Sequence, residues 1–169
     1  MIIQIDSREH ARAIENIERY FDRQGIDHFT SKLYCGDYMS YDNPRLVIDR
    51  KQNLGELCGN VCQQHERFRN EMLRAKEHGI KIAFLCEHGK GIRTLDDVLW
   101  WENPRGKERI RINGKWITRR VKVLHGDVLY KILRTMERKY GVEFLFCDKS
   151  ETGRRITEIL GGWDGCKRA

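Results

Sequence analysis

Asp49, Arg50 and Lys51 have side chains that could support metal-assisted hydrolysis. They follow Val47–Ile48, a β-branched pair that favours a strand. Because side chains alternate along a strand, Asp49 and Lys51 share one face and Arg50 points to the other. Asp37 lies twelve residues before Asp49. A hairpin between these segments would bring a second carboxylate to the same patch.

Two carboxylates and one lysine on one patch suit hydrolysis of a phosphodiester bond. Carboxylate oxygens hold Mg²⁺, which keeps several of its waters; Mn²⁺ accepts the same ligands. A bound metal lowers the pKa of water and stabilises the phosphate in the transition state. The lysine would orient or deprotonate that water, or neutralise developing charge. An ordinary ion pair at a strand end is the alternative interpretation of so short a pattern.

Three short motifs occur in a fixed order along the chain. Asp6–Glu9 (DSRE) follows the apolar run at the N-terminus, Gly36–Tyr38 (GDY) comes next, and Val47–Lys51 (VIDRK) is third. In this order they resemble the nuclease domain of the XPF–Hef–Mus group of structure-specific DNA endonucleases. Arg67–Phe68 and the apolar run Ile82–Glu87 extend the similarity, which covers about residues 2 to 88 and 125 to 161. The resemblance implies a restriction-endonuclease-like fold.

The resemblance also implies roles for seven side chains. Asp37 and Asp49 would be the principal metal ligands, and Lys51 the catalytic lysine. Arg50 would support the site or a phosphate from the opposite face. The neighbouring part of the active centre would consist of Asp6, Arg8 and Glu9, with Glu9 or Asp6 as a further metal ligand. Two departures stand out: Asp49 replaces the usual glutamate, and Gly55 followed by Glu56 occupies the place of a usual aspartate.

Strands and helices alternate along the chain, as is typical of an α/β fold with a mixed sheet flanked by helices. We expect one nuclease domain over residues 1–169. Five strands are expected, at Ile2–Ile5, Ile26–Leu33, Leu46–Lys51, Ile80–Cys86 and Val142–Cys147, with a further extended stretch at Tyr34–Tyr41 and a turn at Asp42–Arg45. Helical spacing predicts a helix through Ile14–Phe21, one long helix at Leu54–Glu77, and others at Leu95–Trp101, Val128–Met136 and Thr152–Leu160.

The net charge of +7 is concentrated in one segment. Residues 104 to 122 hold eight basic residues and one acidic residue, so they carry an excess of seven by themselves. The rest of the chain holds 24 basic and 24 acidic residues and is neutral. A local excess of this size indicates a phosphate-bearing or anionic partner. Asn113–Gly114 within the segment predicts a type I′ β-hairpin inserted into the domain.

Pairing outward from this turn gives the predicted hairpin two different faces. Ile110, Ile112 and Ile117 fall on one face, which we expect to dock on the domain. The basic side chains and one indole would contact DNA, by neutralising phosphates and stacking on a base. The predicted DNA-binding residues are Lys107, Arg109, Arg111, Lys115, Trp116, Arg119 and Arg120. A solvated hairpin with Trp116 packed on its neighbours is the alternative.

Other combinations of residues favour simpler interpretations. Cys58, Cys62 and His65 have the spacing of metal ligands on a helix, but a structural zinc site needs four ligands, so we expect buried thiols and a satisfied histidine. Trp100–Trp101 would make core contacts at a helix end rather than wedge into a DNA junction. No apolar run approaches the roughly 18 residues of a membrane span. The six cysteines are expected to be reduced thiols of an intracellular protein, which a phage or mobile element could encode.

Three functions are compatible with these patterns. The first is a metal-dependent DNA endonuclease acting on branched or flapped DNA in repair or recombination. The second is a non-catalytic DNA-binding scaffold, because the family pairs active with inactive subunits; the presence of both acids and the lysine favours catalysis. The third is a Holliday-junction or single-strand nuclease on the same fold. The resemblance leaves a homodimer open as the assembly.

Overall fold

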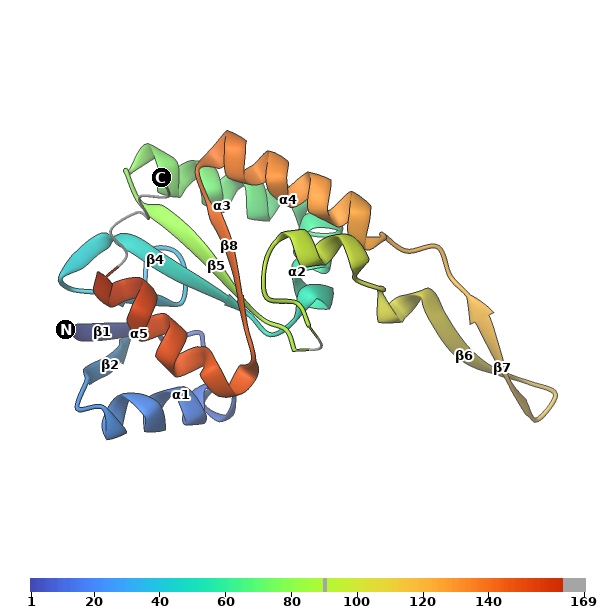
Figure 1. Ribbon diagram of the computed structural model, residues 1–169, viewed down its shortest axis with the longest axis horizontal. Coiled ribbons are helices and arrows are strands. Elements are labelled where there is room, and N and C mark those ends of the chain that lie inside the picture. Colours follow the sequence, from blue (N-terminus) through green and yellow to red (C-terminus); the bar gives the residue numbers. More distant parts are fainter. Residues whose placement is uncertain (90, 163–169) are drawn as a thin grey trace.

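The computed structural model describes residues 1–89 and 91–162. Six strands form one mixed sheet in the order β2-β1-β3-β4-β5-β8 (Figure 1). Strand β3 is antiparallel to both of its neighbours, whereas β1–β2, β4–β5 and β5–β8 are parallel pairs. The strands are β1 (Ile2–Asp6), β2 (Asp27–Ser31), β3 (Tyr38–Ser40), β4 (Asn43–Lys51), β5 (Lys81–Glu87) and β8 (Glu143–Cys147). The predicted α/β class with a mixed sheet is confirmed.

Helices cover both faces of the sheet (Figure 1). Helices α1 (Ala11–Arg23) and α5 (Thr152–Gly162) pack on one face, and α2 (Leu54–Cys62), α3 (His65–Glu77) and α4 (Gly126–Tyr140) on the other. Alternation along β4 divides its side chains between two cores: Val47 faces the α2–α3 layer, and Ile48 faces the α1–α5 layer. Coverage on both faces explains why β5 is apolar along almost its whole length.

The structure corrects several element boundaries. The predicted long helix Leu54–Glu77 is two helices, α2 and α3, separated at Gln63–Gln64. No glycine or proline marks this break, and Val61 and Phe68 on either side keep helical spacing, so the hydrophobic pattern continues across it. The expected helix at Leu95–Trp101 is a 3₁₀ helix, η1 (Asp96–Trp100).

The hairpin formed by β3 and β4 is also shorter than expected. Of the extended stretch Tyr34–Tyr41, only β3 is a strand. Strand β4 begins at Asn43, within the segment where we predicted a turn, because Asn43 already pairs with Ser40. The connection between Ser40 and Asn43 is therefore tight, and the start of β3 lies beside the last part of β4, where Tyr38 pairs with Ile48. The carboxylates predicted to act together lie at these two strand ends.

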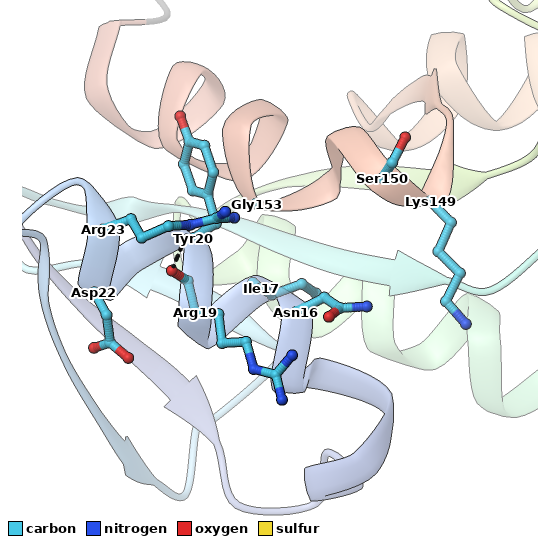
Figure 2. Close-up of a pocket in the computed structure, with 9 residues that line it drawn as sticks. All are labelled: Asn16, Ile17, Arg19, Tyr20, Asp22, Arg23, Lys149, Ser150 and Gly153. Atoms are coloured by element: carbon cyan, nitrogen blue, oxygen red, sulfur yellow. Dashed lines mark hydrogen bonds between the residues drawn. The ribbon is translucent and has the colours of Figure 1, made fainter.

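Helices α1 and α5 approach closely at a glycine. A Cβ atom added to Gly153 would lie 2.8 Å from Cβ of Tyr20 and 2.9 Å from its ring atoms, so glycine permits this contact. A groove of about 540 Å³ runs between α1 and the short 3₁₀ helix η3 (Lys149–Glu151) that precedes α5 (Figure 2). Arg19, Arg23 and Lys149 line it, and Asp22 is its one carboxylate. This groove therefore differs in chemistry from the acidic pocket described below.

The basic segment forms a separate two-stranded sheet. Strands β6 (Lys107–Ile112) and β7 (Lys115–Arg120) follow a 3₁₀ turn, η2 (Pro104–Gly106), and extend away from the body of the domain (Figure 1). Asn113 and Gly114 both have positive φ, at 49° and 79°, as a type I′ turn requires. Within the described residues, no helix is long and apolar enough to cross a membrane.

Candidate active site

An acidic pocket of about 360 Å³ lies at the carboxyl end of β4. Side chains from β4, from the turn before β3 and from the loop before α1 meet there, and helices α2 and α3 close it on one side. The lining residues are Arg8, Glu9, Asp37, Asp49, Arg50, Lys51, Glu56, Asn60, Gln64, Arg67, Phe68 and Glu71. Of the seven residues predicted to form the active centre, six line this pocket. Asp6 is the exception.

A glycine and two backbone hydrogen bonds position Asp37. Gly36 has φ +69°, and a Cβ atom there would lie 3.0 Å from the Ile48 carbonyl oxygen. The Asp37 N–H donates to this same carbonyl over 2.7 Å. The Arg50 N–H donates to Oδ2 of Asp37, also over 2.7 Å. The Asp37 carboxylate therefore accepts the Arg50 N–H of β4, just beyond the point where β3 begins.

Asp49 and Lys51 project together from β4, as the alternation of the strand predicts. Their exposed fractions are only 5% and 9%. Lys51 Nζ lies 2.6 Å from Oδ1 of Asp49 and stands over the rings of Phe68 and Phe84, 5.5 and 5.8 Å from their centroids. These contacts fix the ammonium above the apolar floor of the pocket. Oδ1 of Asp49 is buried, and the Lys51 ammonium is its contact among the described residues.

The pocket disfavours additional negative charge. Burial raises the pKa of Asp37 well above its usual range, and the charges of Asp49 and Glu9 add to this effect. Burial also raises the pKa of Asp49 to about 6; the charge of Lys51 opposes that shift, and Glu71 reinforces it. For Lys51, burial lowers the pKa, but the adjacent Asp49 outweighs burial and the net shift is upward. Lys51 is therefore an ammonium at neutral pH.

Arg50 organises a buried network on the opposite face of β4. Its guanidinium donates to Oε2 of Glu9 over 2.6 and 3.0 Å and to Oε1 of Glu87 over 3.1 Å. Thr152, the first residue of α5, donates its hydroxyl to the same oxygen of Glu87 over 2.9 Å. Because the Arg50 side chain is only 2% exposed, it holds Glu9 rather than contacting a phosphate.

Asp6 lies outside the pocket and supports it. Its Oδ1 accepts hydrogen bonds from the Arg8 backbone and Nε over 2.8 and 2.7 Å. Its Oδ2 accepts from Arg8 Nη2 over 3.0 Å and from the Leu33 N–H over 2.7 Å. Burial raises the pKa of Asp6, but these hydrogen bonds outweigh it, and the net direction is downward. With both oxygens occupied, Asp6 orients Arg8 at the pocket edge, and its alternative role as a metal ligand does not fit.

Sequence reasoning missed several residues of this site. Glu87 could have been found, because it ends an apolar strand two residues after buried Leu85 and so shares its face. No sequence pattern indicated Thr152, because it lies 65 residues from Glu87 along the chain. Asn60 on α2 and Glu71 on α3 also line the pocket, and the helical spacing by itself did not assign either to it.

The donor set suits a divalent cation. Among residues 1–89 and 91–162, no group of three His, Cys, Asp or Glu side chains is arranged to hold a metal ion by itself. Mg²⁺, however, is commonly held by one or two carboxylates and several waters. Asp37 and Asp49 supply such a pair, and the buried Oδ1 of Asn60, which also lines the pocket, has no hydrogen-bond partner among the described residues. These oxygens fit a hydrated cation.

The cysteine pair on α2 differs from its prediction. Cys58 is buried, but Cys62 is exposed, and so is His65 at the start of α3. The two sulfur atoms are 4.0 Å apart. All five cysteines in the described part of the chain are free thiols; Cys166 lies outside it. The prediction of buried thiols and a satisfied histidine was therefore wrong for Cys62 and His65, because the helix ends at Cys62 and turns them outward.

The β6–β7 register separates the predicted DNA-binding residues into two groups. Opposed residues share a face, so the pairs Lys107–Arg120, Arg109–Thr118 and Arg111–Trp116 form one face without an acidic residue. The Arg109 guanidinium lies 5.4 Å from the Trp116 ring. Arg119 and Lys115 lie on the opposite face, where Arg119 pairs with Glu108 over 2.7 Å.

The apolar side of the hairpin does not pack on the domain as predicted. Ile112 and Ile117 are each 47% exposed, because the hairpin extends outward instead of folding back (Figure 1). The tryptophan pair before the hairpin also divides: Trp101 is buried as expected, whereas Trp100 is 84% exposed. Trp116 of the hairpin is therefore exposed together with the cations around it, and Trp100 is exposed at the end of η1.

Comparison with known proteins identifies the domain type. The family model of the ERCC4 domain matches residues 5–159. No curated protein matches the chain. Among solved structures, XPF from Aeropyrum pernix is similar with a TM-score of 0.64 and 16% identity over 95% of this chain. XPF from Aeropyrum pernix in complex with DNA has a TM-score of 0.60 and 17% identity over 94%. The matches span 63% and 62% of those chains.

Proposed function

The chain belongs to the ERCC4 domain family and is an XPF-type nuclease domain, and on this premise we propose that it is a divalent-metal-dependent endonuclease for branched or flapped DNA. The observation that carries the proposal is the pocket at the end of β4. There, the carboxylates of Asp37 and Asp49 converge with the ammonium of Lys51, and Oδ1 of Asn60 beside them has no hydrogen-bond partner among the described residues. An inactive scaffold would have no need to keep this costly arrangement of buried charges.

The metal would be held by Asp37 and Asp49, with Glu9 beside them as the further predicted ligand. A bound Mg²⁺ or Mn²⁺ would supply Lewis-acid activation of the phosphodiester and a more acidic water. Arg50 holds Glu9 in place through two hydrogen bonds and so keeps this carboxylate next to Asp37. Each of these side chains is fixed by a backbone or a buried partner, which is the preorganisation that catalysis requires.

Lys51 would act as a fixed positive charge. Because the net shift of its pKa is upward, it is protonated at neutral pH and unsuited to removing a proton from water. Its contacts with two aromatic rings hold the ammonium at the pocket surface. From there it would stabilise the negative charge that develops on the phosphate oxygens in the transition state. Of the two roles expected from the sequence, electrostatic stabilisation fits this geometry better.

The β6–β7 hairpin would hold the DNA outside the catalytic pocket. Its acid-free face, formed by Lys107, Arg109, Arg111, Trp116 and Arg120, combines phosphate-binding cations with an exposed indole. Cations neutralise phosphates, and an aromatic ring stacks on an unpaired base. This combination supports binding where duplex and single strand meet, as in flaps and splayed arms. Lys115 and Arg119 would contribute less, because they lie on the other face.

Cleavage of a panel of labelled DNA tests the proposal. Linear single-stranded, duplex, 3′-flap, 5′-flap, splayed-arm and four-way DNA would be incubated with the protein in Mg²⁺, in Mn²⁺ or in EDTA. We expect cuts in branched DNA with either metal and none in EDTA, and Asp49→Asn should bind DNA without cutting it. Binding of branched DNA without any cleavage would favour the scaffold. Equal cleavage of linear single strands, or preference for four-way DNA, would overturn the proposed substrate.

A further inference from the structure

Glu71 is a carboxylate of the pocket to which neither the family motifs nor the reaction outlined above assigns a role. It belongs to α3, is half-buried and lines the pocket together with Asp37 and Asp49. No hydrogen bond or ion pair joins Glu71 to another side chain in the described part of the chain. A half-buried carboxylate without a partner, facing two buried carboxylates, is unfavourable unless a cation lies between them.

The other acids of the pocket each have a structural partner. Oε2 of Glu56 accepts the Gln52 N–H over 2.8 Å at the start of α2. Glu9 is held by Arg50, and Asp37 by the backbone of β4. Asp49 forms the ion pair with Lys51. Glu71 therefore differs from the rest, because no hydrogen bond or ion pair within residues 1–89 and 91–162 holds it, and Arg8 interacts with its charge only from a distance.

The charge balance of the pocket calls for an additional cation. Lys51 lies against Asp49, and Arg50 is shared between two carboxylates, so both cations are already engaged. Arg8 lines the pocket edge and interacts with the charges of Asp37 and Glu71, but its ion pair is with Asp6. Arg67 lines the pocket but is exposed, where solvent screens its charge.

We propose that Glu71 is the third carboxylate of the metal site and holds one of the waters of the cation bound by Asp37 and Asp49. This inference rests on the proposed function. Contact through a water accounts for the absence of a three-ligand cage in the described residues, because Mg²⁺ retains part of its hydration shell. Partners of this kind typically affect metal affinity 10- to 100-fold. Glu71 is thus a positioning residue for the metal and its water.

Two effects of opposite sign distinguish this role from a purely structural one. Without metal, Glu71→Gln removes repulsion between carboxylates, so the variant should melt at a temperature roughly 2 °C or more above the wild type. With metal, the same variant lacks one hydrogen-bond acceptor for the hydrated ion, so its affinity should be about 10-fold lower. Loss of a structural contact would lower the melting temperature in both conditions.

Mn²⁺ binding to the full chain, without DNA, tests the inference. Free Mn²⁺ is measured by electron paramagnetic resonance in titrations of the wild type, Glu71→Gln, Asp49→Asn and Glu77→Gln. The last is the matched control, because Glu77 is exposed on the same helix. We expect Glu77→Gln to bind within about twofold of the wild type, Glu71→Gln about 10-fold more weakly, and Asp49→Asn more weakly still.

The outcomes separate this inference from the proposed function. If Glu71→Gln and Glu77→Gln bind Mn²⁺ equally while Asp49→Asn loses binding, the role of Glu71 is refuted and the metal site stands. A lower melting temperature of metal-free Glu71→Gln would refute the repulsion on which the inference depends. If the wild type itself binds no Mn²⁺, the metal dependence in the proposed function fails, and the role of Glu71 fails with it.

Discussion

Asp49→Asn should make the metal-free protein more stable while abolishing its activity. In the folded protein, burial raises the pKa of Asp49 from 3.8 to about 6. One pKa unit corresponds to about 1.4 kcal/mol, so the ionised carboxylate lowers the free energy of unfolding by about 3 kcal/mol. Asparagine has nearly the same shape and no charge. The predicted gain at pH 8 is therefore about 3 kcal/mol.

The pH dependence of this effect follows from the direction of the shift. A carboxyl group whose folded pKa is raised contributes stability below its unfolded pKa, here 3.8, and this contribution is lost as the pH rises through about 6. Wild type and Asp49→Asn should therefore have similar stabilities near pH 4. The difference should increase between pH 4 and 6 and then level off. The charge of Asp49 also helps to raise the pKa of Asp37, so its removal lowers the pKa of Asp37 and stabilises the variant in the same direction.

Urea denaturation at pH 4, 6 and 8 in the presence of EDTA measures this difference. Asp27→Asn is a suitable control, because Asp27 is exposed at the start of β2. Its difference from the wild type should stay small at every pH. The reasoning is refuted if Asp49→Asn is less stable than the wild type at pH 8, because the ion pair with Lys51 would then outweigh the burial of the carboxylate. A difference that does not change with pH would also refute it.

Two further predictions follow from the buried network and from the hairpin. Arg50→Met should lower the free energy of unfolding by about 3–5 kcal/mol in urea denaturation, because it leaves Glu9 and Glu87 without their cation. Arg45→Met is the control at an exposed arginine, with an expected loss below about 1 kcal/mol. An equally small loss for Arg50→Met would contradict the role of the network. In the hairpin, Arg109→Gln combined with Arg111→Gln should reduce the slope of log K against log salt by about 2 in DNA titrations. Arg119→Gln, which removes a cation already paired with Glu108, should change that slope by less, and equal effects would contradict the assignment of faces.

The relative placement of Asp37, Asp49, Arg50 and Lys51 was predictable from the sequence for a physical reason. Asp49 and Lys51 lie on a strand, where the alternation of side chains determines that they share a face and Arg50 does not. Gly36, with its positive φ, determines where Asp37 turns toward β4. These relations are local in the chain and need no knowledge of tertiary packing.

The rest of the site depends on contacts between distant segments. The bond between Thr152 and Glu87 and the ion pair between Arg50 and Glu9 join residues far apart in the sequence. The break between α2 and α3 left the helical pattern intact, so Glu71 was assigned to the continuous helix and not to the pocket. Asn113–Gly114 predicted the register of the β6–β7 hairpin correctly. The direction in which the hairpin extends from the domain depends on the segments that connect it to the domain (Figure 1).

Asp37, Asp49 and Lys51 are proposed to form a hydrolytic site. Single-turnover cleavage of a labelled splayed-arm DNA by the wild type and by Lys51→Met, each saturated with DNA and Mg²⁺, measures the contribution of Lys51 to this hydrolysis. Methionine preserves the apolar contacts with Phe68 and Phe84 and removes only the charge. We predict unchanged DNA binding and a cleavage rate lower by about 10²–10³-fold, in keeping with the loss of one electrostatic group. Cleavage by Lys51→Met at the wild-type rate would contradict the account.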